Sequence, residues 1–458
     1  MNTTKIELHP VIEHAAHKER QNRATAVHRH KPKHAPLVCQ IISDEIGFLS
    51  LRAEWNTLVE QAPVHIYQTF DWQWFWWKHY GANNTLHLMT FRSGDRLIGI
   101  IPMFVQTYTL FGKVLYKRLR MIGCGVDARS NIGLPSEYGP SDYLDVIVLP
   151  EFATEIAEQF ASYVIVSSDL FDEVQFSNVP ENGLLQQYFT AVFDAKRMKL
   201  SLRHNDTCPF VTMPASADDF IERLRPSTRY RVRQSKKEFN RNSPFGLESI
   251  VYRSLLDQAF KDLMYLHQIR WNRLGYAGLF SDSRFGAFQR DVIHSFYEQG
   301  QLWFKAVRMG GIRTAARLGF FFKGRMYDYL SGFDETLPGA KKRPSLALLI
   351  AMIEDAIAKD ASVVDLLRGN EAYKSEMTYE STRNAEILIF NSGRYITLRR
   401  MIYQLLRLLG HLVRRCADEW KLLSVQKNIH GGVTFIFSYA KFVFFRLKSK
   451  IFPQTAGA

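Results

Sequence analysis

The sequence predicts a mixed α+β protein in which one order of elements, antiparallel strands followed by a helix and another strand, occurs twice. Its 458 residues exceed one ordinary domain and suit two domains with extensions. Hydrophobic residues make up 46% and charged residues 23%, so a sizeable core can form. Short apolar runs typical of strands alternate with helical segments in both halves, which favours the duplicated pattern.

In the first half, helices are expected at 48–61 and over the aromatic segment FDWQWFWWKHYG. Two strands, TLHLMTFRS and RLIGIIPMFVQT, flank Gly94-Asp95, a dipeptide typical of a hairpin turn. An irregular stretch follows, and after it come DYLDVIVLP, a helix at 151–166 and a buried strand, FDEVQFSNV.

The second half is expected to repeat this order after two helices, at 217–241 and at roughly 254–272. Three strands follow, QLWFKAVRM, AARLGFFF and RMYDYLSGF, separated by glycine-containing turns. After the loop PGAKKRP, the segment SLALLIAMIEDAIAKD has apolar residues at helical spacing, and Pro344 and Ser345 are good helix-start residues. The strand SVVDLL, the loop GNEAYK and a last strand, AEILIFN, complete the half.

The positive charge is concentrated at the two ends of the chain. Residues 1–37 have seven Lys/Arg against three Glu, and residues 396–458 have eleven Lys/Arg against two acids. The overall charge is +14, so residues 38–395 are nearly neutral, which argues against DNA as a partner. We expect a disordered basic arm at 1–37, folded domains at 38–200 and 201–395, and a basic amphipathic helical tail at 396–458.

The tail has two interpretations. Its apolar residues fall near one helical face with arginines beside them, a pattern suited to the surface of an anionic membrane. The alternative is a helix packed on the protein body with a solvated basic side. A signal peptide and a spanning segment are not expected, because no window is long and apolar enough. The prediction is therefore a cytoplasmic protein, with the tail able to hold it on the inner face of the membrane.

Several common types of site are not indicated. The four cysteines are scattered without metal-ligand spacing, so neither a metal site nor a disulfide framework is expected. The sequence contains no Gly-x-Ser-x-Gly elbow, Walker loop or His-Glu-x-x-His motif.

One stretch resembles a known family. It runs YDYLSGFDETLPGAKKRPSLALLIAMIEDAIAKDASVVDLLRGNEAYKSEMT. It is similar to the BioF-like acetyltransferase domain, or CelD/BcsL family, in its aromatic strand, its Pro338-Gly339 loop, its leucine-rich helix and its "DLLRGNEAYK" segment. In the first half, PVHIYQTFDWQWFWWKHYG, RLIGIIPMF and RLRMIGCG…SEYGPSDYLDVIV add to the likeness, which spans roughly residues 40–390.

The resemblance implies membership of the GNAT superfamily and a likeness to the FemAB peptidyltransferases, which have paired GNAT-like domains. The expected fold is therefore two tandem GNAT-like domains, each a mostly antiparallel sheet flanked by helices. The implied activity is transfer of an acetyl or other acyl group from CoA to an amine or hydroxyl of a sugar or cell-envelope precursor, as in the production of cellulose or another exopolysaccharide. The alternatives are an aminoacyl-tRNA-dependent transferase and a catalytically inactive GNAT pair that serves as a subunit of a polysaccharide synthase.

The phosphate-binding segment departs from the GNAT pattern. GNAT enzymes hold the CoA pyrophosphate with an Arg/Gln-x-x-Gly-x-Gly/Ala loop at the start of a helix, and the double glycine is absent here. The segment still combines cations with a helix N-terminus, which together can bind phosphate. The expected donor-binding residues are Gly339, Lys341, Lys342, Arg343, Ser345 and Lys374.

Acyl transfer needs a base, an oxyanion donor and an acid. Glu371 is the first candidate base, with Tyr373 as the acid, and Asp365 and Asp328 as further catalytic candidates. The alternative for Asp365 and Glu371 is a structural turn with a salt bridge.

Substrate contacts are expected from four residues, namely Arg317, Tyr329, Arg229 and Arg233. Arg317 stands within an otherwise apolar strand, whereas Arg229 and Arg233 share one face of a basic helix that is suited to phosphates or tRNA. A solvated position is the alternative for all three arginines. The tryptophans of the aromatic segment suit a core better than a sugar-stacking surface.

Overall fold

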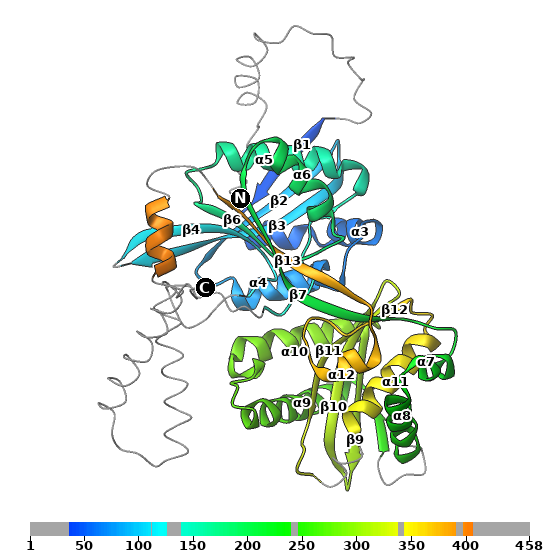
Figure 1. Ribbon diagram of the computed structural model, residues 1–458. Coiled ribbons are helices and arrows are strands. Elements are labelled where there is room, and N and C mark those ends of the chain that lie inside the picture. Colours follow the sequence, from blue (N-terminus) through cyan, green and yellow to red (C-terminus); the bar gives the residue numbers. More distant parts are fainter. Residues whose placement is uncertain are drawn as a thin grey trace, which may run out of the picture.

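In the computed structural model, the described residues are 36–110, 112–125, 139–239, 246–337, 343–390 and 397–405. The expected arm at 1–37 and tail at 396–458 lie mostly outside them. The fold is mixed α/β, with a long, mostly antiparallel sheet flanked by helices (Figure 1). The predicted fold class is therefore confirmed.

The first half of the chain contributes seven of the thirteen strands of the sheet. Its strands are β1 (Leu37–Ile42), β2 (Asn84–Ser93), β3 (Arg96–Leu110), β4 (Lys113–Met121), β5 (Ile147–Val148), β6 (Glu173–Pro180) and β7 (Lys199–Thr212). Its helices are α2 (Glu45–Ser50), α3 (Arg52–Gln61), η1 (Ile66–Gln68), α4 (Phe70–Tyr80), η2 (Pro150–Phe152), α5 (Ala153–Val166), η3 (Leu185–Phe189) and α6 (Thr190–Ala195).

The second half contains the remaining strands, β8 (Gly246–Ser249), β9 (Leu302–Met309), β10 (Ile312–Phe322), β11 (Arg325–Phe333), β12 (Val363–Asp365) and β13 (Ser381–Phe390). Its helices are α7 (Ala217–Arg223), α8 (Pro226–Glu238), α9 (Arg253–Arg273), η4 (Leu279–Ser281), α10 (Ser283–Glu298), α11 (Pro344–Ala358) and α12 (Ala372–Met377). A further helix covers 397–405.

The same order of elements recurs in the two halves. In the first, the antiparallel strands β2, β3 and β4 lead through α5 to β6, which pairs parallel with β4. In the second, β9, β10 and β11 lead through α11 to β12, which pairs parallel with β11. Each unit thus ends in a parallel pair joined by a crossover helix, the connection that a parallel pair requires.

Several elements differ from those expected. The irregular stretch after Thr107 contains the rest of β3 and the strand β4, and DYLDVIVLP forms only the two-residue β5. The single helix expected at 217–241 is split into α7 and α8, because Pro226 lacks the N–H that a continuous helix needs and instead opens α8. The strands β1, β7 and β8 and the helix α10 were not predicted.

The strand order β1-β2-β3-β4-β6-β13-β7-β12-β11-β10-β9-β8 joins both halves in one sheet. β7 pairs with β13 from Lys199 to Pro209 and then with β12 through Thr212, while β13 also pairs with β6. Figure 1 shows these two strands running from one half to the other. The expected domain boundary at 200/201 falls inside β7, and the division into domains stays a proposal.

The halves also share a hydrophobic core. Trp72 of α4 is fully buried and makes edge contacts with Phe288 of α10 and with Phe320 of β10. Trp76 is buried as well, so both tryptophans serve the core. Among the described residues, no helix is long and apolar enough to cross a membrane.

Candidate active site

The sheet opens at the centre of the second half. β11 pairs with β12 only where Arg325 to Tyr327 lie beside Val363 to Asp365. β11 nevertheless continues to Phe333, and a bulge interrupts its pairing with β10 at Leu318 and Gly319. The edge of β11 beyond Tyr327 therefore faces an opening in the sheet, close to the strand–helix connection that leads into α11.

Four predicted residues meet on the α11 side of this opening. Arg317 of β10 forms a buried ion pair with Asp328 of β11, and its Nη2 donates to the Ser345 hydroxyl over 3.0 Å. The same guanidinium lies 5.8 Å from the centre of the Tyr373 ring. The structure therefore brings together Arg317, Asp328, Ser345 and Tyr373, which the sequence separates by up to 56 positions.

The electrostatics of this cluster favour a charged arginine and a neutral phenol. Burial is the largest single influence and opposes the charge on Arg317, but Asp328 and Tyr373 together outweigh it, so the pKa of the guanidinium is raised. Burial and Asp328 raise the pKa of Tyr373, so its phenol stays protonated at neutral pH. Two buried atoms, Arg317 Nε and Asp328 Oδ1, have no hydrogen-bond partner among the described residues, which leaves polar capacity for a ligand group.

The loop after β12 is braced by Lys374. Its Nζ donates to the carbonyl oxygens of Leu367 at 3.1 Å and Arg368 at 2.6 Å, and it pairs with Glu371 at 2.9 Å. Lys374 itself is only 3% exposed, whereas 41% of the Glu371 side chain is exposed. The ammonium is thus engaged within the loop, and Glu371 presents its carboxylate at the surface beside Tyr373.

Asp365 and Tyr329 lie in a different environment, a buried polar cluster between the two halves. Asp365 accepts from the Tyr143 hydroxyl at 3.0 Å and pairs with Arg325 at 2.8 Å, and burial raises its pKa to about 6. The Tyr329 hydroxyl donates to the carbonyl of Pro140 at 2.7 Å. Both residues therefore link the second half to a segment of the first.

The same cluster contains functional candidates that the sequence reasoning missed. His65 contacts the Tyr327 hydroxyl through Nδ1 at 3.0 Å, and burial together with Arg325 lowers its pKa to about 3, so it is neutral. Asp142 pairs with Arg368 at 2.8 Å, and burial raises the pKa of Asp142. A usable signal was the two acidic residues Asp142 and Asp145 within the otherwise largely apolar segment DYLDVIV.

The remaining predicted residues are placed elsewhere or not described. Arg229 and Arg233, both on α8, form ion pairs with Glu222. Arg343 immediately precedes α11 with φ of 60°. Gly339, Lys341 and Lys342 lie outside the described residues, which contain no group of three or more His, Cys, Asp or Glu able to hold a metal.

Comparison with known proteins finds a family model that matches part of the second half. Residues 226–375 match the family model of the acetyltransferase (GNAT) domain. A comparison with curated proteins finds no match. The matched segment contains β11, α11, β12 and the opening between the two strands.

Three solved structures match over 78–79% of this chain. The crystal structure of FemX matches with a TM-score of 0.53 and 11% identity, covering 78% of this chain and 98% of FemX. L-PGS from Bacillus licheniformis matches with a TM-score of 0.44 and 11% identity over 79% of this chain and 97% of its own. A tandem GNAT protein from the clavulanic acid biosynthesis pathway matches with a TM-score of 0.40 and 8% identity over 78% and 100%. The FemX match shows a shared fold.

Proposed function

We propose that the protein is a GNAT-type acyltransferase whose reaction takes place at the opening between β11 and β12. The observation that carries this proposal is the separation of β11 from β12 beyond Tyr327, beside α11 and inside the segment that matches the acetyltransferase domain. The donor is acetyl-CoA or another acyl-CoA. The acceptor is an amine or hydroxyl group of a sugar or cell-envelope precursor.

The opening offers groups that can bind this donor. The free edge of β11 offers backbone N–H and C=O groups that an extended, amide-containing chain such as that of CoA can pair with. The first N–H groups of the 15-residue α11 point toward its start, where they attract phosphate. The unpartnered atoms of Arg317 and Asp328 add polar capacity beside the same helix start.

The reaction joins the acceptor nitrogen or oxygen to the acyl carbon and breaks the bond from that carbon to sulfur. We assign Glu371 to accept the proton that the acceptor releases, because its carboxylate is accessible. Tyr373 is assigned to supply the proton taken up by the leaving thiolate, because its phenol stays protonated. Asp328 holds Arg317, which makes these two residues positioning groups.

The two alternative functions have weaker support. The basic helix α8 favours a tRNA-dependent transferase. However, four of its cations are already paired with carboxylates, namely Arg229, Arg231, Arg233 and Lys236. The alternative of a non-catalytic subunit is supported only by the absence of the double glycine. We retain the acyltransferase because the opening and the unpartnered polar atoms coincide at one place.

The narrower proposal is a protein of the CelD/BcsL type that modifies a precursor of cellulose or another exopolysaccharide at the cytoplasmic face of the membrane. Its support is the helix at 397–405. Tyr403 is buried against Tyr116, and Arg399 pairs with Asp172, whereas Leu398, Met401, Ile402 and Leu405 are exposed. An outward apolar stripe of this kind suits a lipid surface.

The test is calorimetric titration of the full-length protein with acetyl-CoA, followed by measurement of thiol release with glucosamine as the acceptor. Saturable binding is expected in the wild type and in the Glu371→Gln and Tyr373→Phe variants, with thiol release reduced by about 10²-fold or more in each variant. Glu376→Gln, on the same helix, is the matched control and should keep full activity. Absence of binding at millimolar acetyl-CoA would rule out this donor.

A further inference from the structure

A cavity of about 460 Å³ lies on the opposite side of the sheet from α11. It is lined by α9, by the turn between β9 and β10, and by the end of β11 with the residues that follow it. Its volume falls within the roughly 300–1,000 Å³ of small-molecule sites. One of the lining residues is Leu337, which lies six positions before Arg343 at the start of α11.

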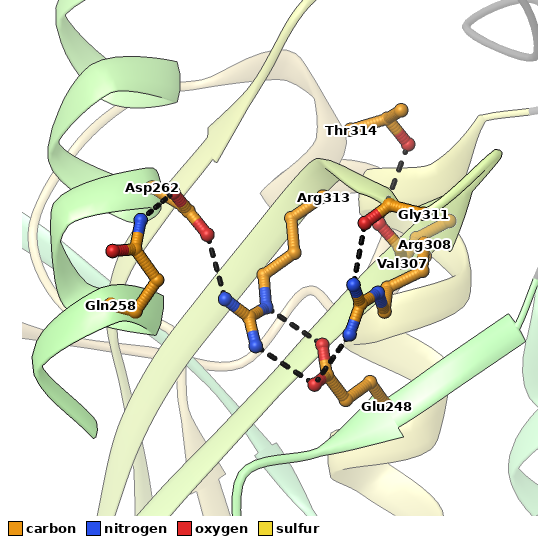
Figure 2. Close-up of polar contacts among 8 residues, drawn as sticks. All are labelled: Glu248, Gln258, Asp262, Val307, Arg308, Gly311, Arg313 and Thr314. Atoms are coloured by element: carbon orange, nitrogen blue, oxygen red, sulfur yellow. Dashed lines mark hydrogen bonds and ion pairs between the residues drawn. The ribbon is translucent and has the colours of Figure 1, made fainter. Parts of the chain in front are cut away.

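The polar wall of the cavity is held rigidly. Arg313 is bound by both oxygens of Glu248, at 2.7 and 2.8 Å, and donates to Asp262 at 2.7 Å (Figure 2). Asp262 also accepts from Gln258 at 2.9 Å. Only 6% of the Arg313 side chain is exposed. The hydrogen-bonding groups are thus fixed before any ligand arrives, which lowers the entropic cost of binding.

The charges of the lining cancel. The lining contains two carboxylates, Asp262 and Asp334, and two guanidinium groups, Arg308 and Arg313. Arg313 is already paired with Glu248 and Asp262, Arg308 with Glu248 at 3.3 Å, and Asp334 with Arg273. A phosphate or an ammonium group would therefore have to break an existing ion pair, whereas a neutral polar ligand would not.

The lining still has capacity for hydroxyl groups. An ionised carboxylate offers about four acceptor positions, of which Asp262 uses two on Gln258 and Arg313. Beside these groups stand Tyr265 and Ile312, which are 62% and 56% exposed. An exposed tyrosine ring next to fixed hydrogen-bonding groups matches a ligand with an apolar ring face and polar edges.

From this combination we infer that the cavity is a binding subsite for a neutral saccharide, separate from the reacting groups. Tyr265 stacks on the sugar ring, and Asp262, Gln258 and Arg308 bind its hydroxyl groups. The assignment of the saccharide as part of the acceptor rests on the proposed function. The binding itself does not, so the two can fail separately.

The experiment is calorimetric titration of the full-length protein with cellotetraose as the neutral probe and tetragalacturonate as its anionic counterpart. Cellotetraose is expected to bind saturably and more tightly than tetragalacturonate. Tyr265→Ala should weaken cellotetraose binding at least tenfold. Tyr230→Ala is the matched control, because Tyr230 is 67% exposed on α8, and should leave binding unchanged.

Acetyl-CoA is titrated into the same variants to separate the two proposals. Unchanged acetyl-CoA binding by Tyr265→Ala, together with lost cellotetraose binding, supports a distinct subsite. If the wild type binds cellotetraose in a Tyr265-dependent manner but does not bind acetyl-CoA, the subsite stands and the proposed donor fails. No cellotetraose binding at millimolar concentration, equal binding by Tyr265→Ala, or equal binding of tetragalacturonate would overturn the inference.

Discussion

Gly369 determines the shape of the loop that holds Glu371 and Lys374. Its φ of 127° lies in a region that side chains rarely adopt, and an added Cβ would press on the Glu371 carboxylate and the Lys374 ammonium. We expect Gly369→Ala to lower the free energy of unfolding by about 1–3 kcal/mol in urea titrations. Gly246→Ala is the control, since nothing lies within 4 Å of its added Cβ. Equal stability of the two variants would contradict this view of the loop.

His87 provides a pH-dependent test of burial. It is 8% exposed, contacts the Tyr163 hydroxyl at 2.7 Å, and burial lowers its pKa from 6.5 to about 4. Between these values the unfolded chain binds a proton that the folded protein does not, so His87 makes stability fall as the pH drops. Relative to His87→Gln, the wild type should lose about 1.4 kcal/mol per pH unit from pH 6.5 toward 4. Parallel stability profiles in urea titrations would contradict the shift.

Individual residues of the site could be predicted from the sequence better than their contacts with one another. Arg317, Asp328, Ser345 and Tyr373 were all candidates, and the structure brings them together. Asp142 and His65 were missed because their partners, Arg368 and Tyr327, lie 226 and 262 positions away. Local pattern predicts which face of a strand a side chain occupies, but not which distant segment covers that face.

At the scale of elements, the sequence left the tail open between a membrane surface and the protein body. In the described part of the tail, the helix at 397–405 packs on the protein body through one side and is exposed on another. Its Tyr403 stacks on Tyr116 with the ring centres 5.0 Å apart, while Met401 and Leu405 are 63% and 57% exposed. Elements with strong periodicity were predicted well, whereas the short edge strand β8 lacked enough residues for a pattern.

The exposed stripe of this helix can be tested on vesicles. Met401→Gln/Leu405→Gln should reduce the fraction of full-length protein that sediments with phosphatidylglycerol vesicles several-fold, because less apolar surface enters the lipid interface. Ile46→Gln/Leu247→Gln removes two exposed apolar residues elsewhere and serves as the control. Sedimentation that is unchanged in the first variant, or equally reduced in the control, would exclude the stripe as a lipid contact.

At the scale of the whole molecule, the duplicated halves are joined more tightly than their sequence order suggests. β13 belongs to the second half by position, yet it pairs with β6 of the first half, and β7 connects it to β12. The buried Trp72 adds side-chain packing between α4 and α10. The duplication could be predicted from the order of elements, but this joining could not, because it depends on pairings between residues 172 to 217 positions apart.

We therefore expect residues 36–405 to unfold as one unit. Four of the eight tryptophans lie in α4, so tryptophan fluorescence is weighted toward the first half. In urea, this fluorescence and far-ultraviolet circular dichroism, which reports on both halves, should give coincident single transitions. A fragment of residues 213–390 should fail to fold, because β12 and β13 lose β7 and β13 also loses β6. Two separated transitions, or a fragment with native-like spectra and a cooperative transition of its own, would show instead that the second half is an independent domain and that β7 and β13 only connect the halves.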